Sequence, residues 1–448
     1  MVSFSAAFRV WLRIAMLSFG GPAGQIALMH RILVEEKRWI SENRFLHALN
    51  YCMLLPGPEA QQLATYIGWL LHRTRGGLVA GGLFILPGFV SILILSILYA
   101  GYQELMVVQA VFFGIKAAVL AVVIEAVLRI GRRALKNSYM YAIAGLAFGA
   151  IFFFDMPFPL IIAVAALVGL AGSRLNPQKF VVIKAHEPTV EGSRPLVDAM
   201  LDDGGGAHTR PSLARTIRVA AFWLALWLLP LIVLVAALGS DNVFSQIGLF
   251  FSKLAVVTFG GAYAVLAYMA QEAVQNYSWL APGEMLDGLA MAETTPGPLI
   301  QVVQFVAFMA AFRQAVGLDP FVAGLLASLL ATWVTFVPCF LWIFAGAPYV
   351  ESLRSNAALS AALSAITAAV VGVVLNLSVW FGLHVIFGEV NELHAYGLRL
   401  HVPVVATINW ASLALAAGAL LATLRFHVGM IPVIGVSALL GVAWYLLP

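Results

Sequence analysis

Two short motifs rich in glycine and proline could bind an anion if they interrupt helices. Gly20-Gly21 recurs 240 positions later as Gly260-Gly261, and Pro56-Gly57-Pro58 recurs at the same spacing as Pro296-Gly297-Pro298. Proline lacks a backbone donor and glycine tolerates unusual dihedral angles, so each motif should end one helix and begin another. The N–H groups and positive dipole at a helix start favour an anion. A packing kink is the alternative, but repetition at matched positions favours a binding site.

Three cations and two amides near these motifs could hold the anion. Arg13 and Lys253 stand at equivalent positions shortly before the Gly-Gly pairs, and Lys116 lies in the middle of an apolar segment. Because a cation in hydrocarbon is costly, it usually has a partner or a function. The symmetric pair predicts a site for a divalent oxyanion, while snorkelling to a lipid headgroup is the alternative for Arg13. Gln61 and Gln301 follow the Pro-Gly-Pro motifs, where they could bind oxyanion oxygens or cap broken backbone.

Three carboxylates, Glu59, Glu125 and Glu293, also lie inside apolar segments. A carboxylate in a low-dielectric site takes up a proton more readily and could carry one during transport. Glu125 precedes Arg129 by about one helical turn, so an intrahelical ion pair is the alternative for that residue. Structural roles stay open for all three.

The elements that position these residues must be membrane helices. Of the 448 residues, 62% are hydrophobic and 10% are charged, and the mean hydropathy is +0.94. Soluble proteins have about 25% charged residues, so a soluble enzyme and a disordered chain are excluded. Long unbroken apolar runs exclude the alternating pattern of a transmembrane barrel. We therefore expect an all-α polytopic membrane protein, with no metal site, no cofactor and no nucleic-acid partner despite a pI of 9.1.

The repeated motifs indicate two homologous halves. Their offset changes from 240 to 251 positions because of an insertion of 11 residues near Gly317 to Pro320. We expect an N-terminal repeat at 1–172, a linker loop at 173–216, a connecting span at 217–240 and a C-terminal repeat at 241–448. One extra span between two repeats places them in opposite orientations, the inverted topology of many secondary transporters.

The distribution of charge supports this inversion. In the first half we expect broken hairpins at 4–33 and 45–71, then spans near 78–101, 104–128, 139–155 and 157–172. The basic residues of this half and of the central loop then fall on one side, whereas the equivalent loops of the second half carry acids. By the positive-inside rule that basic side is the cytoplasm. The N-terminus and the central loop are therefore expected in the cytoplasm of a bacterium, with the chain in its inner membrane.

The motifs together resemble the chromate ion transporter family in its long two-domain form. The resemblance is carried by Phe19-Gly20-Gly21-Pro22, Gln25-Ile26-Ala27, Trp39, Phe45-Leu46, Pro56-Gly57-Pro58 and Gln61. It implies a protein that exports chromate and gives resistance to it, and it adds Gln25 to the substrate site. The second half departs from the pattern at Ala262, Val265 and Met285, so the two halves can differ in function.

The expected function is secondary transport of chromate by alternating access. The GxxxxGK[ST] loop of nucleotide-driven pumps does not occur in the sequence. Transport of sulfate or another oxyanion is the main alternative, and a membrane-bound oxidoreductase is a weaker one because no cofactor motif is present. The expected partners are chromate or sulfate and membrane lipids. We also include a homodimer among the expected assemblies, although no residue pattern predicts it.

Overall fold

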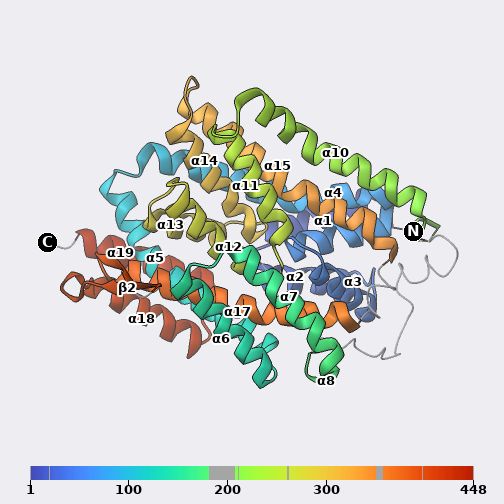
Figure 1. Ribbon diagram of the computed structural model, residues 1–448. Helices are drawn as coiled ribbons and strands as arrows, with labels where there is room; N and C mark the ends of the chain where they lie inside the picture. Colours follow the sequence, from blue (N-terminus) through green and yellow to red (C-terminus); the bar gives the residue numbers. More distant parts are fainter. Residues whose placement is uncertain are drawn as a thin grey trace. The chain divides into compact units, whose positions relative to one another are not determined.

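A computed structural model describes residues 2–19, 21–180, 207–209, 211–259, 262–349, 357–395 and 397–446 (Figure 1). Six helices in this part of the chain are long and apolar enough to cross a membrane. They are α4 (Glu59–Tyr102), α5 (Met106–Ala134), α7 (Phe158–Leu175), α10 (Leu213–Leu238), α15 (Pro320–Gly346) and α17 (Ala357–Ile386). The prediction of an all-α polytopic membrane protein is confirmed.

Shorter elements complete the described chain. The apolar ones are α6 (Ser138–Phe154), α11 (Val243–Val257), α14 (Val302–Gln314), α18 (Trp410–Leu424) and α19 (Met430–Leu446). Single turns are α8 (Pro177–Phe180), η3 (Ala207–Thr209), η6 (Ala347–Tyr349) and η7 (Val405–Thr407). The strands β1 (Val390–Ala395) and β2 (Leu398–Pro403) pair antiparallel, with Val390 opposite Pro403.

The glycine and proline motifs of the first half interrupt helices as predicted. Helix α1 (Phe4–Leu17) is followed by α2 (Gly21–His30) and a π-helix, η1 (Arg31–Glu36). Helix α3 (Glu42–Leu54) ends before Pro56, and α4 begins at Glu59. Gly57 between them has φ of +122°, a conformation that residues with a side chain rarely adopt. Gly20 lies outside the described residues.

The second half repeats this backbone in detail. Helix α11 is followed by α12 (Ala262–Gln271) and a second π-helix, η4 (Glu272–Asn276). Helix α13 (Pro282–Thr294) then ends before the second Pro-Gly-Pro, and η5 (Leu299–Gln301) leads into α14. Gly297 has φ of +102°, and Arg38 and Ser278 share φ of +51°. Gly260 and Gly261 lie outside the described residues, but the surrounding breaks match those of the first half.

The two halves differ where the sequence places the insertion. In the first half α4 continues through a kink at His72 and Arg73, whose backbone is not helical. In the second half a loop with Gly317 at φ of +83° separates α14 from α15. In the second half a loop therefore stands where α4 of the first half has a kink, and this loop accommodates the inserted residues.

The chain forms two compact units, and each contains segments from both halves. The first consists of the described residues within Met1–Ser96, Lys184–Ala262 and Ala292–Asn356; the second, of those within Ile97–Ile183, Tyr263–Met291 and Ala357–Pro448. The units therefore do not follow the sequence repeats. The predicted repeat boundaries describe duplication of the sequence and stay a prediction.

Each unit is held together by apolar helix packing. In the first, α15 packs against α10, α11 and α14; in the second, α17 packs along α5, α6 and α7 (Figure 1). Glycine permits close approach in the second unit: a Cβ on Gly372 would lie 2.1 Å from the carbonyl oxygen of Ala144. Such small-residue contacts drive helix association in lipid, where the hydrophobic effect contributes little.

A polar network ties the β-hairpin to other parts of the second unit. Arg399 on β2 lies 3.0 Å from the Asp155 carboxylate and donates to the Gln275 amide oxygen at 3.1 Å. Gln271, at the end of α12, also donates to Asp155. The hairpin therefore contacts the end of α6 and the π-helix η4 through one partly buried guanidinium.

Candidate functional site

The interrupted helices of the two halves are joined by two equivalent backbone hydrogen bonds. The Gly57 N–H donates to the Thr258 carbonyl at 2.8 Å, and the Gly297 N–H donates to the Ser18 carbonyl at 2.9 Å. Gly57 and Gly297 are repeat equivalents, as are Ser18 and Thr258, so each half donates to the other. All four residues belong to the first compact unit.

Ser18 and Thr258, which supply these carbonyls, stand at the ends of α1 and α11, and their hydroxyl groups bond back to those helices. The Ser18 hydroxyl donates to the Ile14 carbonyl, and the Thr258 hydroxyl donates to the Leu254 carbonyl, both at 2.6 Å. Each bond satisfies a carbonyl near a helix end that would otherwise be unpaired. A hydroxyl residue directly before both Phe-Gly-Gly motifs is visible in the sequence, but its role was not predicted.

The side chain of Gln25 links the break after α1 to the second Pro-Gly-Pro motif. Its amide nitrogen donates to the Gly297 carbonyl at 2.6 Å and lies 3.4 Å from the Ser18 carbonyl. The residue is 2% exposed, and its amide oxygen has no hydrogen-bond partner among the described residues. The repeat equivalent is Val265, which has no amide, so this bridge exists on one side only. The site is therefore asymmetric although its backbone is duplicated.

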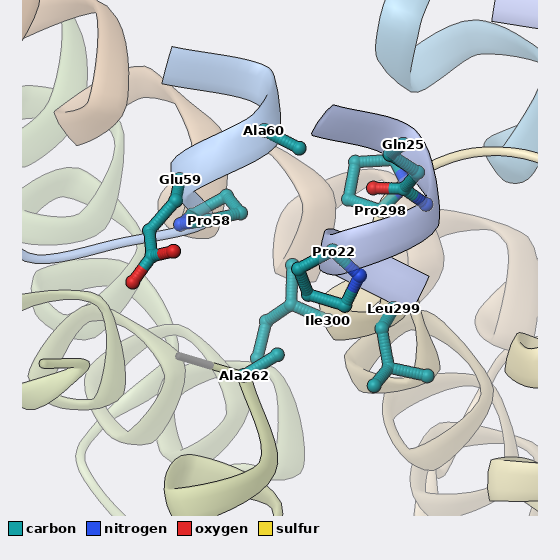
Figure 2. Close-up of a pocket in the computed structure, with 9 residues that line it drawn as sticks. All are labelled: Pro22, Gln25, Pro58, Glu59, Ala60, Ala262, Pro298, Leu299 and Ile300. Carbon is teal, nitrogen blue, oxygen red and sulfur yellow. The ribbon is translucent and has the colours of Figure 1, made fainter. Parts of the chain in front are cut away.

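A small enclosed cavity lies beside these bonds (Figure 2). Its lining residues all belong to the first unit: Pro22, Gln25, Pro58, Glu59, Ala60, Ala262, Pro298, Leu299 and Ile300. Each of these residues lies near the start of α2, α4, α12 or η5, or directly precedes one of these helices. The volume open to the centre of a water molecule is about 10 Å³, room for about one water. A tetrahedral oxyanion is larger, so the cavity must widen to admit one.

Four helix starts at one cavity create an environment suited to an anion. The first-turn N–H groups of a helix have no acceptor within that helix, and its dipole is positive there. Gln25 and Glu59 are the lining residues with polar side chains (Figure 2). An ionised Glu59 would repel an anion, so a dianion in the cavity favours the protonated carboxyl.

The predicted amides lie in the same unit but do not line this cavity. Gln61 donates to the Thr65 hydroxyl at 3.0 Å. Gln301 donates to the Gln304 amide oxygen at 2.7 Å. Gln62, which was not singled out from the sequence, donates from its side chain to the Pro56 carbonyl at 2.7 Å. Gln62 therefore caps the backbone at the first Pro-Gly-Pro motif. From the sequence, this capping role was one of two alternatives for its neighbour Gln61.

The predicted cations do not line the cavity. Arg13 pairs with Glu36 at 2.8 Å and has a side chain that is 47% exposed, and Lys253 is exposed. Lys116 belongs to the second unit, where its ammonium lies 3.3 Å from Asp287. The lining of the cavity therefore comes from the starts of helices and does not include these cations.

The predicted carboxylates have three different surroundings. Glu59 lines the cavity, and Glu293 is buried near the end of α13, with 2% exposure. Glu125 pairs with Arg129 one turn along α5, which agrees with the structural alternative considered from the sequence. Only Glu59 is thus placed where a bound anion would act on it directly.

Comparisons with known proteins identify similar sequences. The chromate transporter family model matches residues 5–170 and again 245–442. A chromate transport protein of Pseudomonas aeruginosa is 30% identical over 83% of this chain and 80% of its own length. A chromate transport protein of Cupriavidus metallidurans is 28% identical over 81% of this chain and 79% of its own length. These relatives are transporters, not enzymes. No solved structure matches the chain.

Proposed function

This chain belongs to the chromate transporter family, and we propose that it exports chromate from the bacterial cytoplasm by alternating access at its interrupted helices. The observation that carries the proposal is the convergence of four helix starts on one enclosed cavity. A cell interior at negative potential favours outward movement of an anion by ~2.3 kcal/mol per charge per 100 mV. A dianion would therefore leave the cell without nucleotide hydrolysis, and export would give resistance.

In this proposal the N–H groups of the first helical turns bind the anion. The Gln25 amide holds the Gly297 segment in position through its 2.6 Å bond. Since the cavity has room for about one water, the structure corresponds to a closed conformation. Opening to either side must separate helix starts that belong to different halves, and the bonds at Gly57 and Gly297 mark where that separation occurs.

We further propose that the halves have inverted orientations, with the N-terminus and the linker loop in the cytoplasm and the chain in the inner membrane. The reciprocal bonds at Gly57 and Gly297 support a twofold relation between the interrupted helices. The basic loops of the first half and the acidic loops of the second support the orientation.

Glu59 and Glu293 remain candidates for a proton that moves with transport, and Glu59 is the better placed because it lines the cavity. A protonated Glu59 would accept a dianion nearby, whereas an ionised one would oppose it. Glu125, already paired with Arg129, is the weakest of the three proposed coupling residues.

Sulfate is the second candidate substrate. Backbone N–H groups recognise oxygens and negative charge, and the lining side chains include no group that distinguishes two tetrahedral dianions. Competition of sulfate against radiolabelled chromate in everted vesicles separates the two. Inhibition by about half at equal, saturating concentrations would assign a general oxyanion transporter, and much weaker inhibition would assign a chromate transporter.

The central experiment is chromate exchange in proteoliposomes that contain the purified chain. We expect the wild type to exchange external labelled chromate for internal chromate, and Gln25→Ala to lower the rate. Arg13→Ala and Lys253→Ala test whether the predicted cations bind the anion. Unchanged exchange in that double variant would leave the helix starts as the binding groups, and absence of exchange in the wild type would refute the proposed function.

A further inference from the structure

The second compact unit contains a cluster of three ionisable side chains around the buried Asp287. The Lys116 ammonium on α5 lies 3.3 Å from Oδ2 of Asp287 on α13. The Tyr99 hydroxyl, near the end of α4, donates to the same oxygen at 2.8 Å. The Asp287 side chain is 3% exposed, and that of Lys116 is 30% exposed. Ionisable groups inside membrane segments are costly and usually serve transport.

The two oxygens of Asp287 have different surroundings. Oδ2 receives both donors, whereas Oδ1 is buried and has no hydrogen-bond partner among the described residues. In the ionised state, Lys116 and Tyr99 stabilise the negative charge. In the neutral state, a proton can bind Oδ1 without displacing either donor. Both protonation states are thus compatible with the same packing, which a group that gains and loses a proton requires.

The cluster occurs once although the sequence is duplicated. The repeat equivalents of Asp287 and Lys116 are His47 and Thr367. An ion pair needed only to assemble the fold would be expected in both halves. Replacing a buried ion pair by apolar groups is often neutral or stabilising, so stability alone does not explain its presence. Its single occurrence favours a functional role.

The cluster is connected through the chain to the interrupted helices. Asp287 lies on α13, which ends at Thr294, directly before the break that contains Gly297. Tyr99 lies on α4, which begins at Glu59 beside the cavity. The backbone of α13 therefore leads from the cluster directly into the segment that Gln25 holds.

We propose that Asp287, paired with Lys116, carries the proton that crosses the membrane in exchange for chromate. The inference rests on the proposed function and assigns the coupled proton to Asp287 in place of Glu59 and Glu293. A proton from the external water forms an O–H bond at Oδ1, which neutralises Asp287 and leaves Lys116 charged. The same proton is released to the cytoplasm, and the ion pair forms again.

Asp287 suits this role better than the carboxylate at the cavity. The titratable groups that act on it are Lys116 from α5, Tyr99 from α4 and Glu284 from its own helix. The Lys116 ammonium, 3.3 Å from Oδ2, stabilises the ionised form of Asp287. At Glu59 an ionised carboxylate would compete with the transported anion, so a proton there is better retained than exchanged.

The test measures anion exchange and proton movement separately in proteoliposomes. Exchange is followed with radiolabelled chromate on one side and unlabelled chromate on the other. Proton movement driven by a chromate gradient is followed with a trapped pH-sensitive dye while potassium and valinomycin hold the potential at zero. The variants are Asp287→Asn, Glu59→Gln and Glu293→Gln, with Glu104→Gln, in the exposed turn between α4 and α5, as the control.

We expect Asp287→Asn to keep chromate exchange and to lose chromate-driven proton movement, while Glu104→Gln keeps both. Asparagine resembles the protonated carboxyl in size but cannot exchange a proton. Proton movement that persists in Asp287→Asn, or that is lost instead in Glu59→Gln or Glu293→Gln, would overturn the inference. Loss of both activities in folded Asp287→Asn would overturn it too.

A milder variant decides the question if Asp287→Asn does not fold. Tyr99→Phe removes a donor that favours the ionised carboxylate, so the pH profile of proton movement should shift to higher pH. An unchanged profile would exclude Asp287 as the proton site. Failure of the proposed function is a separate result, because it would appear as absence of chromate exchange in the wild type.

Discussion

Replacing Gly297 by alanine tests the packing at the interrupted helices most directly. Gly297 has φ of +102°, and an added Cβ would lie 3.0 Å from Cα and 3.1 Å from N of Gly88. A residue with a side chain held in such a conformation costs about 1–3 kcal/mol. Crowding against backbone adds to this cost, because α4 must shift to relieve it.

Gly57→Ala isolates the contribution of that crowding. Gly57 has φ of +122°, so the dihedral cost is similar. Its added Cβ would instead meet Nε2 of Gln62 at 2.8 Å and Sγ of Cys339 at 2.9 Å. Moving Nε2 weakens its bond to the Pro56 carbonyl, but side-chain atoms still move more easily than backbone, so we expect Gly297→Ala to be the more destabilising variant.

The assay is unfolding of the purified protein in mixed micelles, followed by tryptophan fluorescence, together with chromate exchange. Gly145→Ala on α6 is the control, because an added Cβ there meets nothing within 4 Å. It should be neutral or stabilising by up to about 1 kcal/mol. If Gly297→Ala unfolds like Gly145→Ala, or is more stable than Gly57→Ala, the argument from backbone crowding is wrong.

Three further predictions concern the hydrogen bonds of the site and the hairpin. Gln25→Leu removes the amide that bridges the breaks, and the Gly297 carbonyl left unpaired should cost about 1–3 kcal/mol, measured by the same unfolding assay, with slower chromate exchange. Arg399→Gln should increase hydrogen exchange in η4, because its bonds to Asp155 and Gln275 are lost; unchanged protection would contradict this. Burial, assisted by Arg399, lowers the pKa of His401 in the hairpin below 6.5. The neutral form is thus favoured on folding, so stability is complete above about pH 6.5 and falls as the pH drops below it, and His401→Gln should flatten this dependence.

The sequence predicts the interrupted helices because glycine and proline act on their own backbone. Pro56-Gly57-Pro58 and its repeat end helices wherever they stand, since a missing donor and a positive φ are local properties. The spans follow in the same way from apolar length. Repetition at one spacing then relates the breaks of the two halves to each other.

These local rules do not predict which charged residues pair with each other when they lie far apart in the sequence. Arg13 and Lys116 are expected near an anion because cations in apolar segments need compensation. The compensation is Glu36 for the first and Asp287 for the second, and only the packing of helices brings these pairs together. Asp287 is not singled out by its local sequence, and its burial on α13 becomes visible only in the folded chain.

The reciprocal bonds at Gly57 and Gly297 have a consequence for how such a protein can be assembled. Each half contains one donor and one acceptor, and each bond pairs a donor of one half with an acceptor of the other. A polypeptide with a single repeat would carry both unpaired groups into the membrane, where each costs several kcal/mol. Such a polypeptide would need a second chain to complete the core. Because the bonds use main-chain atoms, substitutions such as Gln25 in one repeat and Val265 in the other leave them intact, so the repeats can diverge in sequence while remaining obligate partners.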